Sequence, residues 1–241
     1  MPLTKVCSVY DLGLVDYREG LLLQEKLLNS RKSGAIADVL LLLQHPSVFT
    51  IGCSGVVENI LVPRETLVKE GIPVFHINRG GDVTYHGPGQ LVGYPILNLR
   101  EEGLTAHQYV WNLEEVVIRT LADFGIGGQR VSGRRGVWVG EEKVCALGLR
   151  VSGEVSTHGF ALNVNTNLKY FTYIIPCGIS GVSVTSVSKL LGHEVEIGEV
   201  QVNLLRHFSQ VFKLALEYGE RLDEWLVPSS PSGLKEVLLT R

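Results

Sequence analysis

A continuous apolar run in the first quarter of this 241-residue chain constrains its fold more than any other feature. Residues 39–43 read Val-Leu-Leu-Leu-Leu without a polar break, and the turn signal His45-Pro46 follows closely. A run of this length that ends at a turn signal is typical of a strand buried on both faces. The run therefore predicts a layered fold with a β-sheet at its centre.

Other segments show the spacing of helices and strands. Apolar and charged residues alternate at helical spacing over residues 14–30, and Gly34 closes that helix. Thr105 can cap a helix over residues 106–124, which Gly125 ends. A third helix is predicted over 198–218, with Val202, Leu205, Phe208, Phe212 and Leu216 on one stripe. The predicted strands are 48–51, 73–77, a hairpin of 82–86 with 91–99 around Gly87-Pro88-Gly89, and a meander of 137–139, 143–151 and 155–165 with turns at Gly140 and Gly153.

Together these segments predict an α+β fold, a mixed and mostly antiparallel sheet packed by helices. Strands and helices do not alternate regularly, which disfavours a Rossmann fold. Hydrophobic residues make up 45% of the chain, enough for a full core. No repeat or linker interrupts residues 1–225, so we expect one catalytic domain there and a peripheral tail over 226–241.

Charge and cysteine usage exclude several classes of protein. The net charge of −3 excludes a uniformly basic nucleic-acid binder. The four cysteines (Cys7, Cys53, Cys145 and Cys177) and the seven histidines form neither a disulfide framework nor a metal pattern. No targeting segment or apolar run long enough for a bilayer is present. We therefore expect a cytoplasmic protein without a metal, a cofactor or a membrane partner.

Residues 79–90, Arg-Gly-Gly-Asp-Val-Thr-Tyr-His-Gly-Pro-Gly-Gln, have a composition that folding alone explains poorly. Glycines let backbone approach a ligand closely, and amide groups beside Arg79 suit a carbonyl or carboxylate. Taken alone, the segment fits an ordinary glycine-rich turn equally well. A second notable segment, residues 129–150, has five basic residues against two acidic ones. It suits either an acidic protein partner or a plain solvated loop.

Two cysteines compete for the role of a reactive thiol. Lys143 and Cys145 are two residues apart on a predicted strand, which puts them on one face and lets the lysine activate that thiol. A lysine in this position also commonly reaches solvent. Cys177 lies on a turn between Pro176 and Gly178, whereas Cys145 sits in an apolar strand. Reactive thiols need exposure, so Cys177 is the better candidate.

Five segments together resemble the lipoyl(octanoyl) transferase family, the octanoyl-acyl-carrier-protein:protein octanoyltransferases. Over residues 10–215 the chain departs from that pattern at Gln44, where glutamate is expected, and at Asp82, where glutamine is expected. These departures concern pocket polarity or rim contacts. The matching segments are 43–46 (Leu-Gln-His-Pro), 79–95 (the glycine-rich block extended to Pro95), 143–150 (Lys-Val-Cys-Ala-Leu-Gly-Leu-Arg), 158–165 (His-Gly-Phe-Ala-Leu-Asn-Val-Asn), and 176–179 (Pro-Cys-Gly-Ile) followed by 184–188 (Val-Thr-Ser-Val-Ser).

The resemblance implies the fold of biotin and lipoate protein ligases, with Cys177 as the acyl-thioester nucleophile and Lys143 as the group that lowers its pKa. The implied donor is octanoyl-acyl carrier protein. The implied acceptors are lipoyl domains of 2-oxoacid dehydrogenase complexes and the glycine cleavage H protein. The implied acyl pocket consists of Arg79, Gly80, Gly81, Asp82, Val83, Thr84, Tyr85, His86, Ala146, Leu147, Gly148, Gly159, Phe160 and Ala161.

Three other functions fit parts of the same pattern. An ATP-dependent lipoate or biotin ligase would share the fold but would need no nucleophilic cysteine. A thiol hydrolase would pair Cys177 with His158 or His86 and would release free octanoate. A non-catalytic module would bind an acyl group or a protein without forming an adduct. Cys177 and Lys143 in matching context argue against the ligase, and the motif match as a whole favours the transferase over all three.

Overall fold

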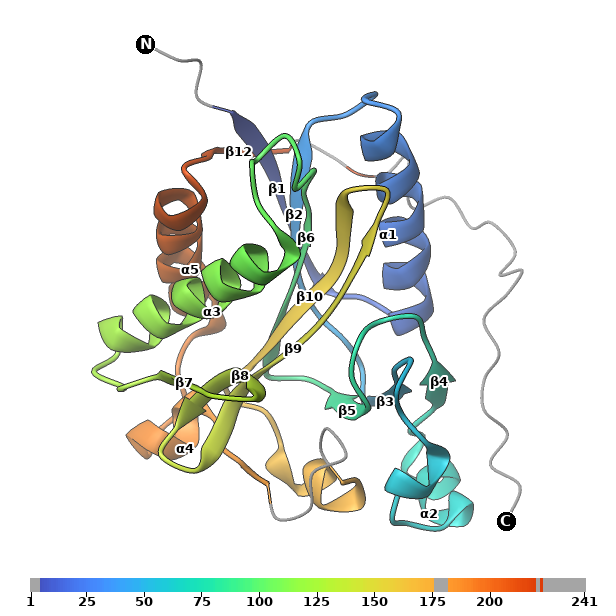
Figure 1. Ribbon diagram of the computed structural model, residues 1–241. Helices are drawn as coiled ribbons and strands as arrows, with labels where there is room; N and C mark the ends of the chain where they lie inside the picture. The colour runs from blue at the N-terminus through green and yellow to red at the C-terminus, as the bar shows by residue number, and fades with distance from the viewer. Residues whose placement is uncertain (1–4, 176–181, 220–221, 223–241) are drawn as a thin grey trace.

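The computed structural model describes residues 5–175, 182–219 and 222, and Figure 1 shows their arrangement. Two β-sheets and five α-helices make up this part of the chain. The strands are β1 (Val6–Leu14), β2 (Asp38–Gln44), β3 (Val48–Ile51), β4 (Val74–His76), β5 (Val83–His86), β6 (Gln90–Ile96), β7 (Gln129–Val131), β8 (Arg134–Val139), β9 (Glu142–Ser152), β10 (Val155–Asn163), β11 (Ser183–Val184) and β12 (Ala215–Tyr218). The helices are α1 (Tyr17–Lys32), α2 (Arg64–Glu70), α3 (Ala106–Asp123), α4 (Val187–Leu191) and α5 (Ile197–Phe212), with 3₁₀ turns at Val57–Asn59 and Leu168–Tyr173.

The large sheet has the strand order β12-β1-β2-β6-β10-β9-β8-β7, with β11 paired to β9. Its centre is antiparallel: β6 pairs with β2 on one side and β10 on the other, and β9 pairs with β10 and β8. Parallel pairing occurs where β1 meets β2 and β12. A smaller sheet of order β4-β3-β5 lies beside it. The predicted mixed, mostly antiparallel α+β fold is confirmed.

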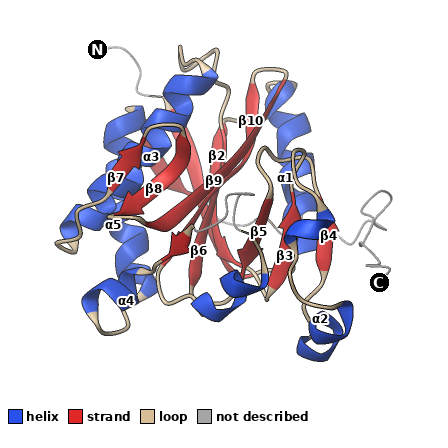
Figure 2. Ribbon diagram, turned by 60° about the horizontal axis from the view of Figure 1, so that its bottom comes forward, coloured by secondary structure: helices blue, strands red, loops and turns tan. Residues whose placement is uncertain are grey.

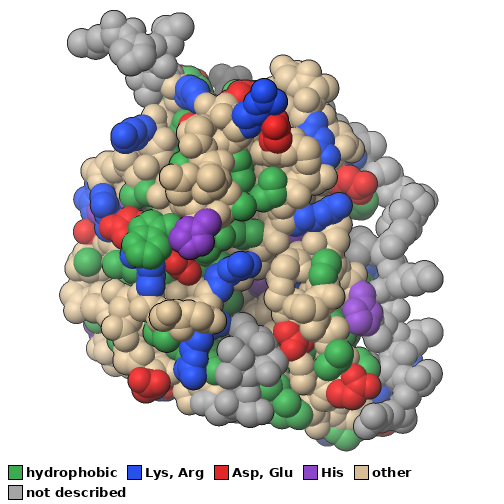
Figure 3. Space-filling view, viewed as in Figure 1, with side chains coloured by type: hydrophobic (Ala, Val, Ile, Leu, Met, Phe, Trp, Pro, Cys, Tyr) green, Lys and Arg blue, Asp and Glu red, His purple; other side chains and the backbone are tan. Residues whose placement is uncertain are grey.

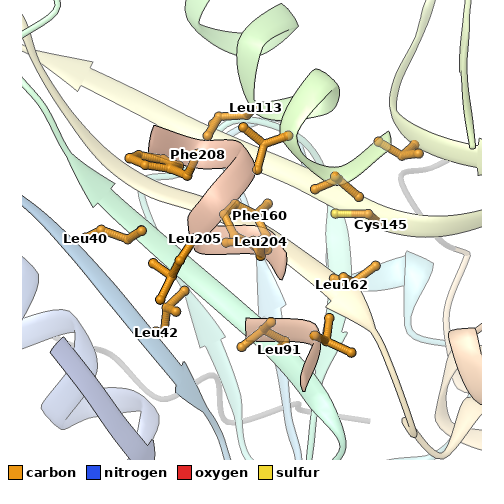
Figure 4. Packing of buried hydrophobic residues seen from close by; sticks show 14 of the residues in the cluster. Leu40, Leu42, Leu91, Leu113, Cys145, Phe160, Leu162, Leu204, Leu205 and Phe208 are labelled. Carbon is orange, nitrogen blue, oxygen red and sulfur yellow. The ribbon is translucent and has the colours of Figure 1, made fainter. Parts of the chain in front are cut away.

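Helices cover both faces of the large sheet, as Figure 2 shows. α1 packs on one face over Leu41 and Ala161, whereas α3 and α5 pack on the other over Leu40 and Leu162. Figure 4 shows this second cluster, with Phe208 of α5 lying against strand residues. Every residue of β2 except Gln44 is buried, because helices close both sides of it. The apolar run at 39–43 therefore has the burial that its composition predicts.

The cap at Thr105 was read correctly from the sequence, whereas the cap of α1 was not predicted. Asp16 accepts a hydrogen bond from the Arg18 N–H at the start of α1. Thr105 and Gln108 form a reciprocal capping box at the start of α3, and Gly125 follows its end with φ +72°. The meander β8-β9-β10 is also confirmed, with Gly140 and Gly153 in left-handed conformations at its turns.

The predicted hairpin between residues 82–86 and 91–99 is wrong. The turn exists, since the Gln90 N–H donates to the Gly87 carbonyl over 3.2 Å. The strands then diverge, β5 into the small sheet and β6 into the large one. Both edges of β6 are already paired with β2 and β10, so β5 has no free edge to join.

The predicted helix over 198–218 is too long at its C-terminal end. α5 stops at Phe212, Lys213 adopts a left-handed φ of +57°, and residues 215–218 form β12 at the edge of the large sheet. Val202 is 65% exposed and does not belong to the buried stripe, which Val200, Leu204, Leu205, Phe208 and Phe212 make instead. The single domain over 1–225 stays a prediction, and the predicted tail over 226–241 lies outside the described residues.

Candidate active site

A cavity of about 50 Å³ lies where the small sheet and the glycine-rich loop meet the middle of the large sheet. Three segments far apart in the sequence contribute to its wall: residues 79–86, 146–148 and 158–161. Every residue that the resemblance implies for the acyl pocket lines this cavity except Tyr85. Tyr17, Tyr94 and His158 complete the wall. The structure therefore brings together in one place residues that the sequence implicated separately.

Backbone hydrogen bonds fix the loop that carries Arg79. The Gly80 N–H donates to the Leu149 carbonyl over 2.9 Å, and the Cys53 N–H donates to the Arg79 carbonyl over 2.9 Å. This loop lies so close to its neighbours that two glycines are required beneath it. A Cβ at Gly52 would come within 2.3 Å of the Gly81 carbonyl oxygen, and one at Gly148 within 2.9 Å of the Arg79 Cδ.

Arg79 is buried, and its guanidinium is held by the small sheet. Its Nη2 donates to the Thr50 carbonyl over 2.8 Å and to the Thr50 hydroxyl over 2.9 Å, while Nη1 donates to the Gly80 carbonyl over 3.0 Å. Several hydrogen bonds are what a buried guanidinium needs to offset desolvation. A fixed positive charge therefore lies beside the cavity.

Asp82, Tyr85 and Gln44 have specific structural partners. The Asp82 carboxylate accepts hydrogen bonds from the Val83 N–H and from the side chain of Asn59. Tyr85 points away from the cavity into the hydrophobic cluster of the small sheet, and its hydroxyl lies 2.9 Å from that of Ser47. Gln44 accepts from the Gly89 N–H over 2.8 Å, at the turn between β5 and β6. Of the two departures from the family pattern, only Asp82 lines the cavity.

Three buried histidines surround this region. His45 bonds the Val15 carbonyl and the Tyr94 hydroxyl, and His86 bonds the side-chain oxygen of Gln90. His158 bonds the side-chain oxygen of Asn78. Burial lowers the pKa of His45 to about 4 and that of both His86 and His158 to about 3, and the charge of Arg79 adds to the shift for the last two. All three rings are therefore neutral at physiological pH.

Tautomers follow from these bonds. Because a carbonyl oxygen only accepts, His45 donates from Nδ1 to Val15 and its Nε2 accepts from the Tyr94 hydroxyl. The Gln90 amide nitrogen donates to Asn163 and to the Tyr85 carbonyl, so its oxygen accepts from His86 Nδ1. An aromatic contact adds to these bonds: the ring of Tyr17 stacks on that of His86, with ring centroids 5.8 Å apart.

Sequence reasoning did not single out Tyr17 or Tyr94 as wall residues. Tyr17 reads as one apolar position of the α1 stripe, and nothing local separates it from its neighbours. Tyr94 did carry a signal, since it belongs to the block 79–95 that matches the family pattern. His158 stood out in the sequence, although its left-handed φ of +56° did not.

Lys143 and Cys145 do not share a face of the sheet. A β-bulge shifts the register between β8 and β9, so that Lys143 opposes Trp138 and Cys145 opposes Val137, with Val144 as the extra residue. Cys145 joins the core under α3 and α5, as Figure 4 shows, where burial raises its pKa. Lys143 turns the other way, and its Nζ lies 4.8 Å from the centroid of the Trp138 ring. The sequence-based rival nucleophile is thus sealed away from the cavity.

Lys143 is only 5% exposed, so the alternative that it reaches solvent is wrong. Strand β11 runs beside it, since Val184 is its register partner and the Thr185 N–H donates to its carbonyl over 2.9 Å. Cys177 lies outside the described residues, between Ile175 and Val182. The Ile175 N–H donates to the Asn59 carbonyl, and the Asn59 side chain bonds Asp82 at the cavity.

Two further findings concern metal ions and membrane-spanning helices. In residues 5–175, 182–219 and 222, no three His, Cys, Asp or Glu side chains are grouped in a way that suits a metal ion. Within the same residues, no helix combines the length and the apolar character that crossing a membrane requires.

Comparison with known proteins places this arrangement in a family. A curated relative from Solibacter usitatus, named octanoyltransferase, is 49% identical over 216 residues, covering 90% of this chain and 97% of the relative. Lipoate-protein ligase A bound with ATP has a similar structure, with TM-score 0.76 and 18% identity over 92% of this chain and 91% of that one. Biotin protein ligase from Aquifex aeolicus, in complex with biotin and ATP, is more distant, with TM-score 0.52 and 18% identity over 86% of this chain and 70% of that one.

At such identities the two solved structures establish the fold alone, which is the lipoate and biotin ligase fold that the sequence predicts. The family model for the lipoyl protein ligase A/B catalytic domain matches residues 16–209, a span that holds both sheets' central strands and every residue of the cavity wall. The chain therefore belongs to the lipoyl protein ligase A/B catalytic domain family.

Proposed function

We propose that this protein is an octanoyltransferase that takes an octanoyl group from octanoyl-acyl carrier protein as a thioester on Cys177 and passes it to the target lysine of a lipoyl domain. The observation that carries the proposal is the common cavity of residues 79–84, His86, 146–148 and 159–161. The relative named octanoyltransferase, which this chain matches over nearly its whole length, supports the same activity.

The reaction proceeds by two exchanges. The Cys177 thiolate attacks the thioester carbonyl of the donor, a new carbon–sulfur bond forms, and the carrier's thiolate leaves and takes up a proton. The neutral amine of the acceptor lysine then attacks the acyl-enzyme and forms an amide, while its proton passes to the Cys177 sulfur. The first exchange replaces one thioester by another, so no ATP is consumed.

Lys143 is the residue we propose to hold Cys177 as a thiolate. A buried ammonium acts in a less polar medium than water, which strengthens its attraction for a nearby anion. The chain on both sides of Cys177 is attached to elements around the site: Ile175 to Asn59, and Val184 to Lys143. Asn59 also bonds the cavity residue Asp82 through its side chain, which supports placing the reaction at this cavity.

The cavity walls suit an acyl chain. Val83, Leu147, Phe160 and Ala161 provide apolar surface, and each CH₂ group buried there contributes about 0.8 kcal/mol to binding. At about 50 Å³ the cavity is far smaller than a typical ligand pocket of roughly 300–1,000 Å³. We therefore expect wall side chains to move apart when the octanoyl chain enters.

Intact mass measurement after incubation with octanoyl-acyl carrier protein tests the proposal. Wild type is expected to gain one octanoyl group that hydroxylamine removes, and Cys177→Ala is expected to gain none. Cys53→Ser is the matched control, since Cys53 is an exposed thiol and its loss should leave the adduct in place. An octanoyl thioester that persists in Cys177→Ala contradicts the assignment. ATP-dependent modification by free octanoate in that variant favours the ligase instead.

Lys143→Met tests the role of the lysine. A thiol of pKa about 8.5 is only a few per cent ionised at pH 7, whereas a thiol that Lys143 holds as a thiolate is mostly ionised there. Loss of the lysine should therefore slow acylation about 30-fold at pH 7. The deficit should shrink as the pH rises toward 9, because the thiol then ionises without help. A deficit that stays constant from pH 7 to pH 9, in a variant that melts like wild type, contradicts this role.

A further inference from the structure

A groove of about 820 Å³ runs along the surface beside the cavity, between the first half of α3, the β7–β8 hairpin and the end of β9. We call it the arginine groove, because four arginines line it. Figure 3 shows Lys and Arg side chains (blue) gathered in the middle of this face, next to hydrophobic (green) and histidine (purple) side chains. The residues used below are Trp111, Arg130, Arg134, Arg135, Arg150 and Val151.

The positive charge of the groove is only partly balanced within the described residues. Arg130 pairs with Glu114 and Glu115 at 3.3 and 2.8 Å and stacks on the Trp111 ring. Arg134, Arg135 and Arg150 are exposed, and no carboxylate of residues 5–175, 182–219 or 222 forms an ion pair with them. Three such cations in one groove of a chain with net charge −3 create a local positive field.

Apolar surface accompanies this charge. Trp111 is 51% exposed and Val151 40% exposed, both within the groove. Tryptophan and arginine are the residue types that most often dominate the energy of protein–protein interfaces. The groove thus combines apolar side chains that can pack against a folded partner with a positive electrostatic potential that favours an acidic partner.

One end of the groove adjoins the cavity. Leu149 lines the groove, and its carbonyl accepts the hydrogen bond from Gly80 in the cavity wall. An Nη1 of Arg135 lies 3.8 Å from the position that a Cβ on Gly80 would occupy. A partner in the groove is therefore placed with its edge at the loop that lines the cavity.

We infer that the arginine groove is the docking surface for the acidic carrier protein that delivers the acyl group, an inference that rests on the proposed octanoyl transfer. The donor's thioester arrives on an arm that carries a phosphodiester, and exposed guanidinium groups at the cavity loop suit that anion. The acceptor lysine approaches as an ammonium ion, before it loses the proton and attacks, and three unbalanced arginines repel that cation. Charge therefore assigns the groove to the donor.

The test compares a carrier-bound donor with a small one. Arg134→Glu/Arg135→Glu reverses two charges in the groove, and Lys69→Glu/Lys213→Glu makes the same charge change at exposed positions elsewhere. We expect the groove variant to lower kcat/KM for octanoyl-acyl carrier protein at least tenfold relative to that for octanoyl-pantetheine, and the control pair to leave the ratio unchanged. Raising the salt from 50 to 300 mM should reduce the wild-type ratio and leave that of the variant almost flat.

Binding of octanoyl-acyl carrier protein, measured by calorimetry with Cys177→Ala as the background, separates this inference from the proposed function. If the groove substitutions weaken carrier binding at least tenfold, the docking surface is supported, even if no acyl-enzyme forms with any donor. The absence of an acyl-enzyme with every donor would overturn only the proposed transferase. Unchanged carrier affinity overturns the docking surface. An equal loss of kcat/KM with both donors also overturns the docking surface. A loss of kcat/KM confined to the lipoyl-domain half-reaction overturns it as well and assigns the groove to the acceptor.

Discussion

Under α3 and α5, the large sheet buries aliphatic and aromatic side chains together with two thiols, Cys7 and Cys145. Its other face, toward α1 and the small sheet, buries three histidines and Arg79 beside the cavity. On the first face burial raises the pKa of both thiols, and they stay protonated. On the second face each of the three histidine rings has a hydrogen-bond partner. One sheet thus separates the two buried thiols from the polar groups of its candidate active site, while Leu147 and Phe160 of the apolar cluster also reach the cavity wall.

The largest effect we expect comes from the apolar face. Phe208 is fully buried in the α3–α5 cluster, with its ring centroid 4.5 Å from that of Phe212. Phe208→Ala should lower the free energy of unfolding by about 3–5 kcal/mol, because it removes apolar contacts and leaves a cavity. Urea unfolding measures this, and Val202→Ala on the exposed side of α5 should change stability by less than about 0.5 kcal/mol. Comparable losses from both variants contradict the division of this helix into a buried and an exposed side.

The acid sensitivity of the protein should come from the polar face. The pKa of His158 is about 3 when folded, against about 6.5 when unfolded, so below pH 6.5 the unfolded chain binds a proton that the folded chain does not. Stability is therefore complete above that pH and is lost as the pH falls toward 3. Between pH 7 and pH 5 this histidine alone costs about 2 kcal/mol, and His45 and His86 act in the same direction.

The variant His158→Asn tests whether this histidine causes the loss of stability in acid. Asparagine tolerates the left-handed backbone at this position, and it does not titrate. Denaturant unfolding at pH 7 and pH 5 should show a stability difference about 2 kcal/mol smaller in the variant than in wild type. The absolute stability at pH 7 can fall as well, since the bond to Asn78 is lost. Equal differences in the two proteins contradict a neutral, buried imidazole.

The same contrast between faces explains which features the sequence predicted. A strand buried on both sides consists of a continuous apolar run, so β2 could be predicted from the sequence. The cap at Thr105 is a local signal, and it marked the start of α3. The hairpin failed because the Gly87-Pro88-Gly89 turn says nothing about β6, whose edges are paired with strands from distant parts of the chain. The predicted C-terminal end of the last helix was wrong because residues 215–218 pair with the strand β1 at the edge of the large sheet.

The site was predicted as a set of residues but not as a geometry. The glycine-rich block and its partners on β9 and β10 were identified through the family pattern, and they meet at the cavity. The pattern included Tyr85 as well, because residues next to each other on a strand cannot be told apart without knowing which face is buried. Lys143 and Cys145 were placed on one face because a cross-strand bulge leaves no mark in a single sequence.

Cys145 gives the smallest expected effect and the most direct contrast with a thiol outside the core. It is fully buried, so Cys145→Ala removes one sulfur and should cost about 1 kcal/mol of stability. In the folded wild-type protein, iodoacetamide should modify the exposed Cys53 quickly and Cys145 only after unfolding, because alkylation requires an accessible thiolate. Mass spectrometry of peptides from a labelling time course measures both rates. Labelling of Cys145 at the rate of Cys53 would mean that the α3–α5 face opens in the native state, and the separation between the two faces would then not hold.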